Sequence, residues 1–223
     1  VTASEADAIQ DIAKYSGADS DYDITDNAAA LISAGDDVLN VAGVDIVTAS
    51  DTSVNANIGG DLAGFTADIE FNVVDNADAI AIEVAASGTG AGSLDEANNV
   101  AVVSGDVTAS EADAIQDIAK YSGAASDYDI TDNATALISA GDDVLNVAGV
   151  DIVTASDTSV NANIGGDLAG FTADIEFDVV DNAAGLIAEM GGADVAGHLT
   201  EANSITVDDT QTGSVVMRMM ERY

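Results

Sequence analysis

The sequence of 223 residues predicts an α/β repeat fold, a solenoid of short strands and short helices with about 50 residues per unit. One reason is a long tandem repeat. The phrase VTASEADAIQDIAKYSGA begins at Val1 and returns at Val107, a period of 107 − 1 = 106 residues. Over the first 76 positions the two copies differ at three, which are Asp19/Ala125, Ala29/Thr135 and Asn72/Asp178. One unit of this size buries little apolar surface alone, whereas stacked neighbours share a continuous core.

A second, shorter repeat lies inside the first. An aromatic residue that leads into Asp-Asn-Ala occurs at Tyr22, Phe71, Tyr128 and Phe177, with spacings of 71 − 22 = 49, 128 − 71 = 57 and 177 − 128 = 49. We expect these aromatic side chains to point inward from equivalent strands. The spacing divides the chain into a partial leading unit (1–21), three repeat units (22–70, 71–127 and 128–176) and a final unit with an atypical Met- and Arg-rich tail (177–223).

The first predicted helix covers residues 5–16. Ser4 is a candidate N-cap, acidic residues stand in the first turn, and Gly17 follows the last turn. Ile9 and Ile12 are spaced to lie on one face, so we expect them to be buried.

Alternation of apolar and polar residues predicts strands at 44–48, 54–58 and 69–73. Gly59-Gly60 then predicts a turn into a short helical stretch at 61–65. Each Asp-Asn-Ala phrase offers a helix N-cap. The alternative fold is a pair of β-rich, immunoglobulin-like modules of 106 residues in tandem.

Composition restricts the function classes. The chain has 41 acidic and four basic residues, a formal charge of −37, no Cys and no Pro. Nucleic acid is excluded as a partner because its binding depends on Lys and Arg. No stretch is long and apolar enough for a membrane span. Self-repulsion at this charge requires screening by salt or bound cations, which favours a secreted or cell-surface location.

The repeat phrases resemble those of large acidic secreted and surface-layer proteins of bacteria, of adhesin, surface-layer or matrix type. The residues that carry the resemblance are YDITDNAAAL, FNVVDNADAI and VTASEADAI. The resemblance implies a structural or adhesive role and frequent dependence on calcium. The nonapeptide signature of calcium-binding β-rolls is absent, because IGGDLAGFTAD has its glycines at other spacings.

Alternating carboxylates provide a candidate calcium loop. Asp19, Asp21 and Asp23 alternate as in such loops, although Ile24 and Ala30 replace the Gly and Glu that an EF-hand needs. The second copy retains two of these acids, Asp127 and Asp129. The competing interpretation is a solvated acidic turn.

One aspartate recurs in every unit, at Asp26, Asp75, Asp132 and Asp181. Helix N-capping is the favoured interpretation. The alternative is a row of carboxylates on consecutive coils, which would need bridging Ca²⁺ because like charges repel. Asp36-Asp37 and Asp142-Asp143 could add oxygen ligands.

These observations predict a structural protein, not an enzyme, that forms part of a surface layer, fibre or matrix. The glycine-rich stretch at 87–93 lacks the Lys of a phosphate-binding loop, and the single histidine, His198, has no nucleophile motif near it. Incomplete units at both ends predict head-to-tail assembly with further copies. The alternative function is an adhesin segment that binds glycans or another cell surface, with Tyr15 and Tyr121 as candidate sugar platforms.

Overall fold

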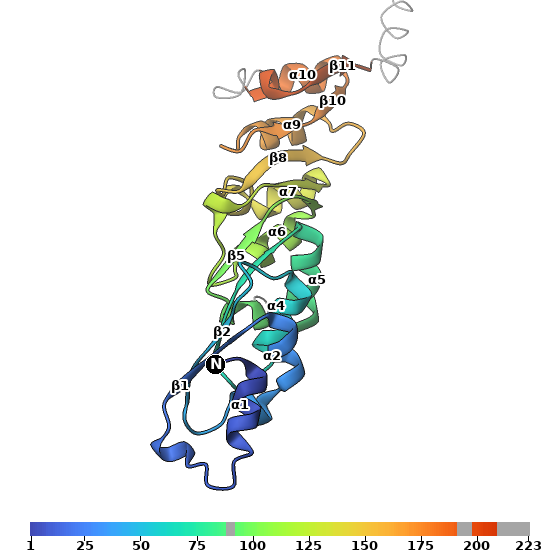
Figure 1. Ribbon diagram of the computed structural model, residues 1–223. Helices are drawn as coiled ribbons and strands as arrows, with labels where there is room; N and C mark the ends of the chain where they lie inside the picture. The colour runs from blue at the N-terminus through green and yellow to red at the C-terminus, as the bar shows by residue number, and fades with distance from the viewer. Residues whose placement is uncertain (88–91, 191–197, 209–223) are drawn as a thin grey trace, which may run out of the picture. The chain divides into compact units, whose positions relative to one another are not determined.

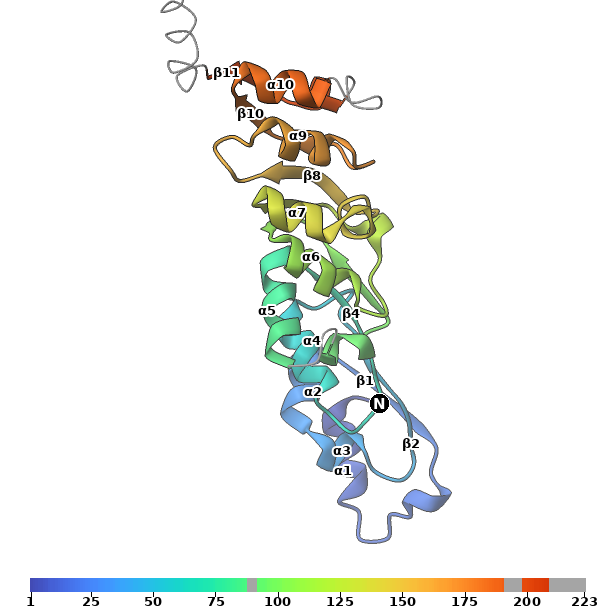
Figure 2. The same ribbon diagram turned by 180° about the vertical axis from the view of Figure 1, so that it is seen from behind.

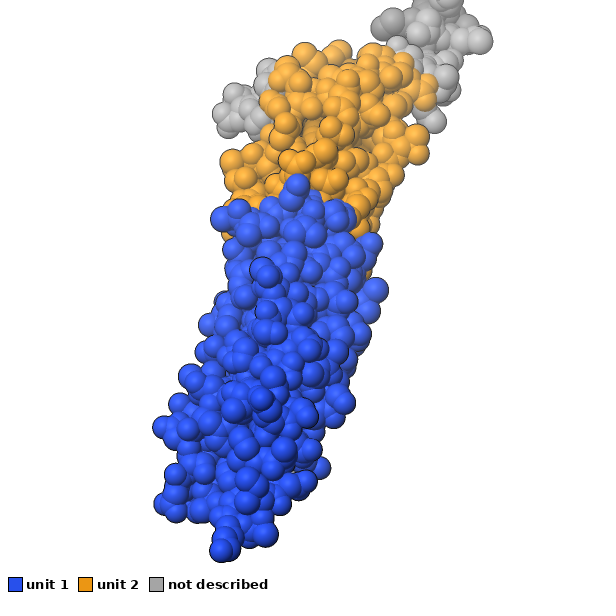
Figure 3. All heavy atoms as spheres, viewed as in Figure 1, with its two compact units in different colours: residues 1–105, 113–128 blue, residues 106–112, 129–223 orange. Residues whose placement is uncertain are grey.

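The computed structural model is a mixed α/β structure with small parallel sheets, and it describes residues 1–87, 92–190 and 198–208. The chain divides into two compact units (Figure 3). Unit 1 contains Val1–Gly105 and Asp113–Tyr128, and unit 2 contains Asp106–Ala112 and Asp129–Tyr223.

The elements are short throughout. In chain order they are α1 (Ala3–Gln10), η1 (Gly17–Asp19), β1 (Tyr22–Asp26), α2 (Ala28–Ala34), α3 (Asp36–Leu39), β2 (Val44–Ala49), α4 (Ala56–Ala63), β3 (Ile69–Glu70), β4 (Asn72–Asp75), α5 (Ala77–Ser87), η2 (Gly92–Glu96), β5 (Asn99–Val102), β6 (Asp106–Val107), α6 (Ala109–Gln116), η3 (Gly123–Ala125), β7 (Tyr128–Asp132), α7 (Ala134–Ala140), α8 (Asp142–Leu145), β8 (Val150–Ala155), α9 (Ala162–Ala169), β9 (Ile175–Glu176), β10 (Asp178–Asp181), α10 (Ala183–Met190), η4 (His198–Glu201) and β11 (Ser204–Val207).

Unit 1 has a strand side and a helix side. Strands β1, β2 and β3 form a parallel sheet in sequence order, in which Ile24 pairs with Val47 and Val47 with Ile69. Strands β4 and β5 form a second parallel pair. Helix α1 packs on α2, α2 on α4 and α4 on α5. Figures 1 and 2 both show α2, α4 and α5 on the side opposite β1 and β2. Parallel strands need such crossover connections.

Unit 2 repeats this plan. Its sheet has the order β6-β7-β8-β9, and β10 pairs in parallel with β11. Val153 pairs with Ile175 just as Val47 pairs with Ile69 in unit 1. Helix α9 packs against both α7 and α10.

The core consists mainly of Ala, Val, Ile and Leu side chains, and within the described ranges no polar or charged side chain is buried. Three of the four repeated aromatics lie in it, with Phe71, Tyr128 and Phe177 at most 3% exposed. Tyr22 is half-buried. Tyr22 and Tyr128 begin their strands, and Phe71 and Phe177 directly precede theirs; in all four cases the residue two positions later is buried, which places the aromatic on the inner face.

The first helix differs from its prediction. It begins earlier, at Ala3, and ends at Gln10. The N-cap is Thr2, whose hydroxyl accepts from the Glu5 N–H, while a Glu5 carboxylate oxygen accepts from the Thr2 N–H at 2.9 Å. This capping box satisfies two helix-end groups and outcompetes Ser4 as the cap. The predicted burial of Ile12 is wrong, since this side chain is 58% exposed.

The predicted strand at 54–58 is also wrong. Helix α4 begins at Ala56, because the Asn55 side chain accepts from the Ile58 N–H at 2.9 Å and caps the helix. Only Val54 takes part in a strand contact, an isolated bridge to Val73. The two glycines therefore lie inside a helix instead of forming a turn. A Cβ at Gly59 would come within 2.6 Å of Val73, so glycine permits close packing of helix on strand.

Candidate functional site

Asp26 and Asp75, two of the predicted metal ligands, each contact the start of a helix that precedes them in the chain. Oδ2 of Asp26 accepts from the N–H of Ala3, the first residue of α1, at 3.2 Å. Its Oδ1 accepts from the backbone and side-chain N–H groups of Asn27 at 2.8 and 3.0 Å. Oδ2 of Asp75 accepts from the N–H of Ala56, the first residue of α4, at 2.9 Å, and its Oδ1 accepts from the following asparagine in the same way.

The second copy reproduces both arrangements. Oδ2 of Asp132 accepts from the N–H of Ala109 at 3.2 Å, and Oδ2 of Asp181 accepts from the N–H of Ala162 at 3.0 Å. Ala109 and Ala162 are the first residues of α6 and α9. In both cases the second oxygen accepts from the next asparagine.

Two further aspartates, which the sequence analysis did not single out, also accept from the first N–H of a helix. Asp51 Oδ2 accepts from the N–H of Ala28, the first residue of α2, at 2.7 Å, and Asp157 Oδ2 accepts from Ala134, the first residue of α7, at 2.6 Å. The sequence signal was spacing, because 51 − 26 = 25 and 75 − 51 = 24. We call this set the helix-start carboxylates: Asp26, Asp51, Asp75, Asp132, Asp157 and Asp181.

The predicted N-cap role therefore belongs to a neighbouring residue. Asn27 caps α2 through its side-chain oxygen, which accepts from the Ala30 N–H at 3.0 Å, and Asn76 makes the matching bond at the start of α5. The preceding aspartate instead accepts from the first N–H of an earlier helix, a group that has no partner within that helix. A carboxylate is favoured there because the helix N-terminus carries partial positive charge. Each bond thereby ties the end of a strand to the start of an earlier helix.

The predicted loop of unit 1 has its acidic side chains exposed. Asp19 lies in η1, where its carboxylate accepts from the Ser16 hydroxyl at 3.0 Å. Asp21 is exposed between η1 and β1, and Asp23 is exposed on β1.

In the second copy, Asp127 is exposed and its backbone N–H donates to the Val102 carbonyl at 2.8 Å. The carboxylate of Asp129 accepts from the Ile152 N–H at 3.2 Å. Over the described residues, no three acidic or histidine side chains converge as a metal-ligand group.

Asp36 and Asp142 anchor a loop. Both carboxylate oxygens of Asp36 accept from the Thr66 N–H at 3.0 and 3.1 Å, and Oδ1 also accepts from Ala67 at 3.1 Å. The backbone bond from Thr66 is the main reason that the pKa of Asp36 lies below its usual value. Asp142 makes the same contacts with Thr172 in unit 2, and its pKa is lowered for the same reason.

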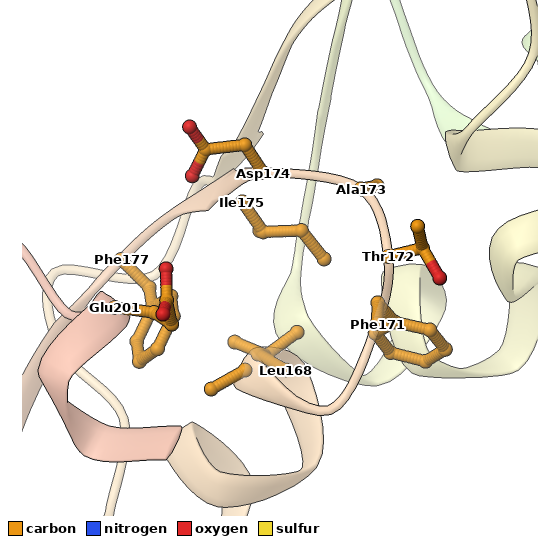
Figure 4. A pocket seen from close by; sticks show the side chains of 9 residues that line it. Leu168, Phe171, Thr172, Ala173, Asp174, Ile175, Phe177 and Glu201 are labelled. Atoms are coloured by element: carbon orange, nitrogen blue, oxygen red, sulfur yellow. The ribbon is translucent and has the colours of Figure 1, made fainter. Parts of the chain in front are cut away.

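A pocket occurs at the same place in each copy. In unit 2 its volume is about 270 Å³, and in unit 1 the matching pocket measures about 290 Å³. Figure 4 shows Phe171 and Phe177 on opposite sides of the unit 2 pocket, which Glu201 also lines. Glu96 takes the place of Glu201 in unit 1. The pocket therefore combines one partly exposed aromatic side chain, Phe171, with an exposed carboxylate, Glu201.

The two candidate sugar platforms are half-buried. The Tyr15 hydroxyl donates to the Ala42 carbonyl at 2.9 Å, and Tyr121 forms an isolated bridge with Val100. The glycine-rich stretch at 88–91 and the Met- and Arg-rich tail within 209–223 lie outside the described residues.

Comparison of the chain with protein-family models, with curated proteins and with solved structures gave no match. Of the helices that the structure describes, none has the length and apolar character needed to cross a membrane.

Proposed function

We propose that this chain is an extracellular structural repeat protein that forms part of a surface layer, fibre or matrix by assembling with further copies of itself. The observation that carries the proposal is the series of helix-start carboxylates. Six times along the chain, a carboxylate at or just beyond the end of a strand accepts from the first N–H of an earlier helix. Repetition of one hydrogen bond between strand and helix, in place of a single asymmetric site, suits a structural role.

The proposed architecture is a solenoid in which each 50-residue unit contains two strand-and-helix steps. Support comes from the parallel pairing of consecutive strands β1, β2 and β3, and from the helices between them, since α2 and α3 follow β1 and α4 follows β2. Small-angle X-ray scattering tests this, because a solenoid requires a rod-like profile whereas two separate modules give a two-body profile.

The proposed role is non-catalytic and the proposed setting is outside the cell, stabilised by Ca²⁺. The charge of −37 supports cation dependence, since bound divalent ions reduce self-repulsion. An ion at 100 times its dissociation constant would stabilise the fold by about 2.7 kcal/mol. Thermal unfolding in calcium and in chelator, at equal ionic strength, measures this. Equal midpoints would reject specific calcium sites.

Negative-stain electron microscopy over a range of protein concentrations, with and without calcium, tests the structural role. Ordered fibres or sheets are expected. Dispersed single particles under every condition would contradict the proposal.

The duplicated pocket favours a second candidate function, glycan binding by an adhesin segment. An accessible aromatic side chain and a carboxylate suit a hydroxyl-rich ligand, and Phe171 and Glu201 provide both in unit 2. A glycan array with the native chain and a Glu96→Ala/Glu201→Ala variant tests it. Binding that is equal in both proteins, or no binding, would reject the pocket as a sugar site.

A further inference from the structure

The two copies of the repeat differ in the exposure of matching residues at two surfaces. In the first copy Ile12 is 58% exposed, whereas the equivalent Ile118 of the second copy is 2% exposed. Conversely, Ile205 on β11 is 48% exposed, whereas the equivalent Val100 on β5 is fully buried. The surface that contains Ile118 is thus covered in the second copy, whereas the matching surface around Ile12 is exposed in the first. The strand that contains Val100 is covered in the first copy, whereas the matching strand around Ile205 is exposed in the second.

The chain next to Ile118 is bound by the segment that contains Val100, and both lie in unit 1. The Val100 N–H donates to the Lys120 carbonyl at 3.0 Å, and the Val100 carbonyl accepts from the Ser122 N–H at 2.8 Å. The Val102 N–H donates to the Ser126 hydroxyl at 3.0 Å. This contact joins the outer edge of β5 to the segment 115–127. We call it the internal junction.

Both surfaces of the internal junction are repeated elsewhere in the chain. Segment 9–21 matches segment 115–127 at every position except Asp19, where the second copy has Ala125. It also has the same local structure, since η1 corresponds to η3 and the Ser20 hydroxyl donates to the Ser16 carbonyl at 2.8 Å as Ser126 does to Ser122. We call residues 9–21 the acceptor surface.

Strand β11 corresponds to β5 in its pairing, although the sequences SITV and NVAV share only their last residue. It pairs with β10 in the register that β5 has with β4, so that Ile205 stands opposite Val179 as Val100 stands opposite Val73. Within the described ranges, β10 is the only strand that pairs with β11, whereas β5 also bridges to Tyr121. Val207 is 53% exposed, while its counterpart on β5 is fully buried. We call β11 the donor strand.

We propose that the donor strand of one copy binds the acceptor surface of a second copy and reproduces the internal junction between two chains. The expected bonds join Ile205 to the backbone of Lys14 and Ser16, and Val207 to the Ser20 hydroxyl. The occupant is a second copy because the chain already contains, in β5, a related strand seated on a nearly identical surface. This inference rests on the self-assembly in the proposed function and names the contact that produces it.

The contact joins two different surfaces, so it is heterologous and extends into open chains or closed rings. Each added copy brings further negative charge, so assembly should strengthen with ionic strength. Burial of exposed Ile and Val side chains supplies the attraction between copies, once salt has screened the repulsion between their negative charges.

The test uses three variants of the full chain in sedimentation velocity. Ile12→Asp damages the acceptor surface, and Ile205→Asp/Val207→Asp damages the donor strand. Ile152→Asp is the control, because this β8 side chain is 42% exposed and belongs to neither surface. All four proteins are first compared by circular dichroism and thermal unfolding, so that only folded variants are interpreted.

The native chain and Ile152→Asp are expected to form species whose mass grows with concentration. Each surface variant alone should need about tenfold or more protein to associate. An equimolar mixture of the two surface variants should form dimers and stop there, since each dimer uses the one intact donor and the one intact acceptor.

Failure of the contact and failure of the proposed function give different results. Native assembly that neither surface variant weakens, or a mixture without dimers, overturns this contact but leaves a self-assembling structural protein. A native chain that stays monomeric at high concentration, with salt and calcium present, overturns both.

Discussion

Replacement of Asp75 by alanine separates the two interpretations of the helix-start carboxylates. Asp75 was predicted as a possible calcium ligand, and in the structure its Oδ2 instead accepts from the Ala56 N–H at 2.9 Å. Asp75→Ala removes this acceptor and the Oδ1 that serves the next asparagine. Both roles predict destabilisation, but only the metal role predicts dependence on calcium.

The magnitude follows from the burial of the donor. Ala56 is fully buried, so water cannot readily replace the lost acceptor, and an unsatisfied buried N–H costs about 1–3 kcal/mol. The groups of Asn76 are partly exposed and can bind water instead. We therefore expect Asp75→Ala to lower the free energy of unfolding by about 2 kcal/mol. Asp75→Asn keeps one oxygen and should cost less.

The assay is urea unfolding followed by circular dichroism, in calcium and in chelator at equal ionic strength. Asp45→Ala is the matched control, because it removes the same charge from an exposed position on β2. Hydrogen bonding predicts the same loss for Asp75→Ala in both solutions. If Asp75→Ala lowers the free energy of unfolding no more than Asp45→Ala does, the hydrogen-bond argument is refuted. If it lowers this free energy only in the calcium solution, Asp75 belongs to a metal site.

The other predictions concern helix packing and acid stability. Gly59→Ala should destabilise the fold by about 1 kcal/mol despite the higher helix propensity of alanine, because the new Cβ meets Val73 at 2.6 Å. Gly60→Ala should be neutral or stabilising, since its Cβ meets only the mobile end of the Glu83 side chain; equal thermal midpoints for the two variants would contradict this packing. Asp36→Asn should reduce stability at neutral pH, and the difference from the native chain should vanish in acid. The folded-state pKa is lowered, so the stabilisation is present above the usual pKa of about 4 and is lost as pH falls through the folded-state value. Urea midpoints at several pH values measure it, and a difference that persists well below pH 3 would contradict the assignment.

Local pattern predicted part of the fold. The strand expected at 44–48 is β2, Val44–Ala49, where β-branched residues are concentrated. The inward direction of Phe71 and Tyr128 followed from the alternation of apolar and polar residues. At 54–58 alternation predicted a strand that does not form, because Asn55 caps helix α4 instead. Glycine at position 59 suits this helix, because Val73 packs too closely to leave room for a Cβ.

The site was harder to predict because its contacts join residues about 20 positions apart. The recurrence of Asp26 and Asp75 was visible, but which N–H each would meet depends on how strand and helix pack. Burial of Ile12 was expected from helical spacing, yet identical spacing leaves Ile118 buried and Ile12 exposed. Only the segment seated on the surface distinguishes the two positions, and no local pattern carries that information.

The helix-start carboxylates have a consequence for the order in which the chain is made. Each donor N–H precedes its carboxylate by 23 or 19 residues, as in Ala28 with Asp51 and Ala56 with Asp75. A helix that leaves the ribosome or a secretion pore is therefore incomplete until the next strand has emerged. We expect each step to remain frayed at its start for that interval and then to be completed by the chain that follows it. Folding would thus proceed in one direction, from the N-terminus, at the pace of synthesis or export.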